Sequence, residues 1–177
     1  MKKRSFLLLF VCLSLVVAAW AASEALPADN WKDTFPDQYN SYLKNADNKD
    51  TYSYVEAHPQ IAVLYEGFGF AHSYFAARGH EYALEDVKNI GRPHPLANCL
   101  TCKSGDYTAM VNKMGDAAYK IPFDEAFEQL AGGISCYNCH GNDVPGLEVT
   151  HAYLLNATAG DDIKPQNLAC AQCHVEY

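Results

Sequence analysis

The chain has 177 residues, with 13 basic and 21 acidic side chains and a formal net charge of −8. Because it is acidic and has no basic stripe, we expect no nucleic-acid partner. Its length suits one domain with a modest core. Six of its seven cysteines belong to three short motifs, which are taken below in chain order.

The first 21 residues have the pattern of a secretory signal peptide. Three basic residues at positions 2–4 precede an apolar run over residues 6–19, and Ala19 and Ala21 are the small residues of a cleavage site. We therefore predict cleavage after Ala21, a mature part of residues 22–177 and a periplasmic location. An uncleaved membrane anchor stays open as the alternative, although the run falls short of the roughly 18–20 residues that usually span a bilayer.

The mature part is predicted to be mainly α-helical. A short helix is expected over residues 37–44, and an apolar, aromatic packing helix over residues 59–77. A third helix opens at His80 and is stopped by Gly91, with Arg92 near its end. Further helices are expected over residues 107–120, 122–130 and 149–156, and a last one starts at residue 165.

Three pentapeptides carry paired cysteines: CLTCK at residues 99–103, CYNCH at 136–140 and CAQCH at 170–174. Cysteines three apart lie on one helical face and can both form thioethers to one haem, while the next residue reaches the iron. The two histidine versions favour haem attachment strongly over a zinc or disulfide pair. For CLTCK alone, a disulfide or structural pair is an equally open alternative.

The predicted attachment residues are Cys99, Cys102, Cys136, Cys139, Cys170 and Cys173, and the predicted iron ligands beside them are Lys103, His140 and His174. These motifs use every cysteine of the mature part, so no structural disulfide is expected. A lysine amine binds iron only after losing its proton, and a haem that only passed electrons would gain little from it. We therefore expect the opposite face of the CLTCK haem to be open, as a substrate site.

In order and spacing, CLTCK, CYNCH and CAQCHVEY, preceded by an Arg-Gly-His segment and a later arginine, resemble the amino-terminal part of the ammonia-forming cytochrome c nitrite reductases. These are periplasmic pentahaem enzymes, and the similarity runs from about His58 to Tyr177. The resemblance implies a multihaem cytochrome c fold, with helices and irregular loops packed around covalently bound haems. It implies three c-type haems in this chain and five in the full-length protein.

The resemblance also implies roles for single residues. Lys103 would be the proximal ligand of the catalytic haem, beside an active-site arginine and tyrosine matched by Arg92 and Tyr177. His80 would be the distal ligand of the third haem, opposite His174. From the residues alone, Arg92 is a cation at a helix end, Tyr177 an aromatic cover and His80 a capping or surface histidine.

A calcium ion beside the active site is implied as well, with oxygens from the Glu176 side chain and the Tyr177 carbonyl. The remaining four histidines have no match and are expected to be structural or surface residues: His58, His72, His94 and His151.

The implied reaction is the six-electron reduction of nitrite to ammonium in dissimilatory ammonification. The electron donor would be a membrane-anchored quinol-oxidising cytochrome or a soluble cytochrome, and the full-length enzyme a homodimer. The family's other catalytic residues lie beyond Tyr177, so we expect a truncated chain that is inactive alone. The alternatives are a trihaem electron carrier, or another multihaem nitrogen-cycle enzyme such as a hydroxylamine oxidoreductase or an octahaem nitrite reductase.

Overall fold

The computed structural model describes residues 25–47, 58–60, 63, 78–90, 93 and 96–175. Within them the regular structure is helical, apart from one isolated antiparallel bridge between Leu96 and Pro122. In chain order the elements are η1 (Ala28–Trp31), α2 (Pro36–Leu43), η2 (Lys44–Asp47), α6 (Ala83–Asn89), η3 (Ala97–Cys102), α7 (Gly105–Met114), η4 (Gly115–Lys120), α8 (Phe123–Phe127), α9 (Tyr137–His140), α10 (Ala152–Ala157) and α11 (Pro165–His174). The predicted α class is confirmed. The predicted signal peptide and most of the helix expected over residues 59–77 lie outside the described residues.

One apolar core joins α6, η3, α7, η4 and α8. Its fully buried members come from all five elements: Val87, Ala97, Leu100, Tyr107, Val111, Ala118, Phe123 and Ala126. The Tyr107 hydroxyl donates to the Ala118 carbonyl at 3.0 Å, so even the polar end of this ring has a partner inside the core. This core holds η3, and with it the first cysteine pair, in a fixed place.

The prediction of a single helix over residues 107–120 is wrong. Ser104 caps α7, its side chain accepting from the Tyr107 amide, and α7 ends at Met114, with Gly115 as its C-cap at φ +62°. Glycine adopts this left-handed backbone without the steric penalty of other residues, so the chain turns there and continues as the 3₁₀ helix η4. The helix predicted over residues 122–130 is also shorter than expected, since α8 ends at Phe127.

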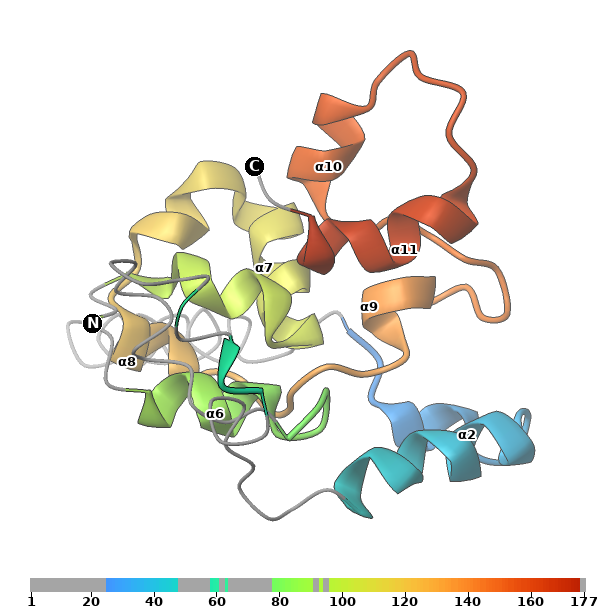
Figure 1. Cartoon of the computed structure of the whole chain (residues 1–177). Coiled ribbons are helices and arrows are strands. Elements are labelled where there is room, and N and C mark those ends of the chain that lie inside the picture. Colours follow the sequence, from blue (N-terminus) through green and yellow to red (C-terminus); the bar gives the residue numbers. More distant parts are fainter. Residues whose placement is uncertain are drawn as a thin grey trace, which may run out of the picture.

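The second half of the described chain packs differently. α9 packs against α7, and α11 packs against η3. Figure 1 shows α10 next to α11, with α6 and α8 on the opposite side of α7 from both. A small second apolar cluster, formed by Ala25, Ala109 and Tyr137, connects α9 to α7. Within the described residues, no side chain of α9, α10 or α11 belongs to the large apolar core.

No helix within the described ranges combines the length and the hydropathy needed to cross a bilayer.

Candidate haem-binding site

The first cysteine pair lies on η3, a 3₁₀ helix and not an α-helix. In a 3₁₀ turn residues i and i+3 eclipse, so Cys99 and Cys102 still share one face. The residues between them point the other way, and Leu100 is fully buried in the apolar core. The Ala97 amide donates to the Ile121 carbonyl at 2.9 Å, which ties the start of the turn to the core. Both cysteines are left partly exposed, and neither forms a disulfide.

The second pair lies on the short helix α9, where Tyr137 and Asn138 are buried and Cys136 and Cys139 are partly exposed. His140 Nδ1 lies 2.9 Å from the Gly146 carbonyl. A carbonyl can only accept, so Nδ1 carries a proton, and in the neutral ring Nε2 then has the lone pair. A histidine that ligates iron through Nε2 needs this tautomer.

The third pair lies on α11, which begins at a proline in its first turn and ends at His174. Gln172, between the two cysteines, is 1% exposed, whereas Cys170 and His174 are exposed. All three motifs therefore follow one rule: at least one residue between the cysteines is buried, and the cysteines stay accessible.

His80 and His174 are brought together from distant parts of the chain. Their ring centroids are 6.2 Å apart, with the ring planes at 44°. Burial lowers the pKa of His80, and the nearby His174 and Lys103 lower it further, so His80 is neutral at pH 7 and has a lone pair to offer a metal. Lys103, the residue after the first motif, therefore lies in the same region as the two rings.

Arg78 anchors the segment that carries His80. Its guanidinium lies 2.6 Å from Asp86 and 2.9 Å from Glu85, both on α6, and stacks 4.3 Å over the Tyr82 ring. Gly79 follows with φ +93°, a conformation that side-chain-bearing residues rarely adopt. The ion pair and the glycine turn together direct His80 towards α11. Sequence reasoning assigned no anchoring role to Arg78, because its partners come from the next helix.

Sulfur atoms of two different motifs meet at a buried histidine. Cys102 Sγ, Cys173 Sγ and a ring nitrogen of His151 all lie within 4.8 Å of one another. A thiol hydrogen bond with Cys102, together with burial, raises the pKa of Cys173. A metal held here would take one cysteine from each of two pairs and leave Cys99 and Cys170 without partners. The arrangement is therefore better explained as the meeting point of two haem-attachment segments.

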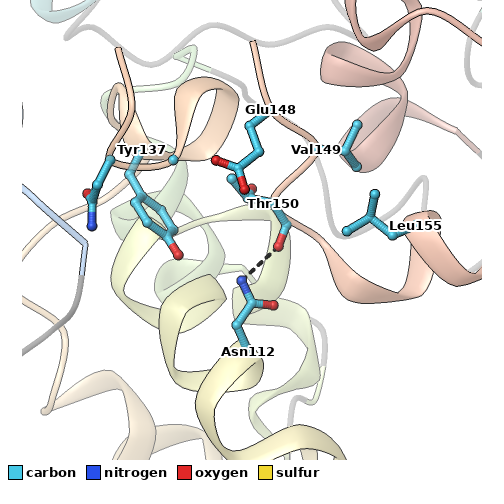
Figure 2. Close-up of a pocket in the computed structure, with 8 residues that line it drawn as sticks. Asn112, Tyr137, Glu148, Val149, Thr150 and Leu155 are labelled. Carbon is cyan, nitrogen blue, oxygen red and sulfur yellow. Dashed lines mark hydrogen bonds between the residues drawn. The ribbon is translucent and has the colours of Figure 1, made fainter. Parts of the chain in front are cut away.

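A surface pocket of about 260 Å³ lies beside α9. Figure 2 shows Asn112, Tyr137, Glu148 and Thr150 around it, with the Asn112 amide donating to the Thr150 carbonyl at 2.8 Å. None of the predicted haem-binding residues lines this pocket. The predicted active-site residues Arg92 and Tyr177, and Glu176 with its proposed calcium, lie outside the described residues.

A helical chain that presents paired cysteines on three turns, each followed by a lysine or histidine, defines a c-type cytochrome. The model of the cytochrome c552 family matches residues 27–177. The chain belongs to the cytochrome c552 family.

Two curated relatives named cytochrome c-552 are each 32% identical to it. The one from Maridesulfovibrio salexigens aligns with 85% of this chain and 33% of its own length, and the one from Parabacteroides distasonis with 84% and 35%. The chain thus spans about a third of the length of these relatives.

A solved structure of cytochrome c nitrite reductase from Desulfovibrio desulfuricans superposes with a TM-score of 0.69 at 25% identity. The match covers 88% of this chain and 41% of that one, whose catalytic subunit is described as having two calcium sites. The predicted multihaem cytochrome c fold is confirmed by this likeness.

Substitution of Arg78 by alanine should destabilise the protein by about 2 kcal/mol, because it leaves the carboxylate of Asp86 without its partner. Lys88→Ala on the same helix is the control, since Lys88 is exposed and only stacks over Phe127. We expect a clear fall in the free energy of unfolding for Arg78→Ala and a change within about 0.5 kcal/mol for Lys88→Ala. Equal effects in the two variants would contradict the anchoring role.

Proposed function

We propose that the whole protein is a cytochrome c nitrite reductase that takes nitrite to ammonium with six electrons, and that residues 22–177 are its amino-terminal trihaem part. The observation that carries this is the CLTCK turn. Cys99 and Cys102 are partly exposed on a turn fixed by the core, as the cysteines of the other two motifs are on theirs. A lysine follows in place of the histidine that would suit a closed electron-transfer haem.

The His80–His174 pair supports haem binding at the third motif. An imidazole nitrogen binds a metal at about 2 Å, so two rings on one iron have centres roughly 6 Å apart. The observed separation of 6.2 Å fits this value. The protonated Nδ1 of His140, held by the Gly146 carbonyl, similarly suits iron ligation through Nε2 at the second motif.

Bound at the first motif, haem would supply an iron that binds nitrite and passes electrons to it. Lys103 would hold that iron from one side as a neutral amine. Arg92 would attract the nitrite anion and donate hydrogen bonds to it on the other side. Tyr177 would donate a hydrogen bond or carry a proton. Glu176 and the Tyr177 carbonyl are oxygen donors of the kind that calcium prefers.

The same proposal implies a location, an oligomeric state and an electron donor. We place the protein in the periplasm after cleavage of residues 1–21. The whole enzyme, with five haems, would form a homodimer and take electrons from a membrane-anchored quinol-oxidising cytochrome or a soluble cytochrome.

The number of attached haems tests the first requirement of the proposal, which is that all three motifs bind haem. Expression in a host that attaches haem to both CxxCH and CxxCK motifs should give an intact mass with three added haems, because the cysteines of all three pairs are at least partly exposed and none forms a disulfide. The matched control is Lys103→His, which should let an ordinary haem-attachment system load the first motif. Two haems in both proteins would show that CLTCK is not an attachment site.

Replacing His80 should leave the iron of the third haem with one ligand fewer. In His80→Ala we expect one haem to change from low-spin to high-spin in electron paramagnetic resonance (EPR) and absorption spectra, with the haem number unchanged. His58→Ala, at a histidine with no assigned role, should leave the spectra as in the wild type. An unchanged low-spin population in His80→Ala would remove His80 from the ligand set.

A further inference from the structure

Gln172 joins the second and third motifs through a saturated set of hydrogen bonds. Its Nε2 donates to the carbonyl of Asn138, inside the second motif, and to the carbonyl of Ala169 at 3.0 Å. Its Oε1 accepts from the amides of Thr150 at 3.0 Å and His151 at 3.2 Å. Both amide protons and the acceptor oxygen are therefore used, and the side chain has one workable orientation.

His151 extends this network to the first motif. Its ring is 2% exposed, with Nδ1 2.9 Å from the Gln172 carbonyl and Nε2 3.2 Å from the Thr108 hydroxyl. With Nδ1 donating to Gln172, the single proton of that hydroxyl is the one that Nε2 accepts. The hydroxyl oxygen also lies 3.0 Å from the Ser104 carbonyl and 3.2 Å from the carbonyl of Thr101, which stands between the two cysteines of CLTCK. Burial lowers the pKa of His151 although the Gln172 carbonyl opposes the effect, so the ring is neutral at pH 7 and donates through Nδ1 alone. One chain of polar contacts thus runs through all three motifs.

The network lies outside the large apolar core, among residues of the second half of the chain and of α7. The large buried cluster ends at α8, and neither α10 nor α11 contributes to it. Buried hydrogen bonds such as those of the Gln172 amide need partners at specific positions and so favour one register between elements, whereas apolar contacts tolerate sliding. His151 also lies against the sulfurs of Cys102 and Cys173, which belong to different haem-attachment segments. A shift of this ring would change the distance between those two anchoring points.

We propose that Gln172 and His151 are positioning residues that set the spacing of the three haem-attachment segments. They thereby set the electronic coupling between the haems, above all between those anchored at Cys102 and Cys173. The inference rests on the proposed function, because it needs haems on all three motifs. Neither residue touches substrate or iron in this account.

The test compares Gln172→Leu and His151→Leu with matched controls in the haem-loaded protein. Gln166→Leu makes the same change on the exposed face of α11, and His58→Leu replaces an exposed histidine. Haem number comes from intact mass, haem–haem magnetic interaction from EPR of partly reduced samples, and midpoint potentials from redox titration. We expect three haems throughout, with altered interaction signals and shifted potentials in the two network variants only.

Wild-type interaction signals and potentials in both network variants, with only a lower melting temperature, would overturn the inference, because the network would then stabilise without positioning. If Gln172→Leu does not fold, Thr150→Val serves instead. It keeps the Thr150 amide on Gln172 and removes the hydroxyl, which lies 3.0 Å from the Asn138 carbonyl and 3.3 Å from Gln172 Oε1. A smaller shift of the same kind supports the inference, and no shift overturns it. Failure of the proposed function itself would appear already in the wild type, as fewer than three haems.

Discussion

The structure depends on how a helical turn distributes the four residues of a CxxC motif between its two faces. Two cysteines on one face force the residues between them towards the other face. Leu100, Asn138 and Gln172 occupy these inner positions and are buried, while the cysteines around them stay accessible. The inner residues therefore hold each motif in the fold, and the cysteines are left available for covalent chemistry.

The three inner residues are held by different physical means. Leu100 is packed in the apolar core, and a turn held in this way withstands the loss of any one polar contact. Asn138 and Gln172 are tied by hydrogen bonds between main chain and side chain, in a part of the chain whose described helices do not contribute to the large apolar core. The faces of bound haems would add apolar area to this second half. The likeness to a nitrite reductase fold is consistent with such a division.

Much of this could be predicted from sequence, because it is local. The cysteine spacing located the motifs, proline in the first turn marked the start of α11, and the α class followed from periodicity. The break at Gly115 was missed because a helical pattern of apolar residues continues across it. The approach of His80 to His174 was expected from family resemblance alone, since nothing in the local sequence indicates it.

The residues that sequence reasoning missed are polar ones whose burial arises from long-range contacts. Gln172 was given no role beyond its place between the two cysteines of its motif, and His151 was expected to be a structural or surface histidine. Each is buried only because residues 138 and 150–151 pack against α11. The periodicity of apolar residues along the chain does not indicate that such polar residues are buried. A polar residue of high hydrogen-bonding capacity between two attachment cysteines was the one clue available.

The central claim is that the haem at CLTCK is the site where nitrite binds. Titration of the oxidised full-length protein with nitrite, followed by EPR and absorption spectra, tests it most directly when wild type is compared with a Cys99→Ser and Cys102→Ser double variant. The double variant must contain one haem fewer and keep the low-spin signals of the others. The account predicts that nitrite changes the spectrum of one haem in the wild type and of none in the variant. A nitrite response that survives the loss of the CLTCK haem would contradict it.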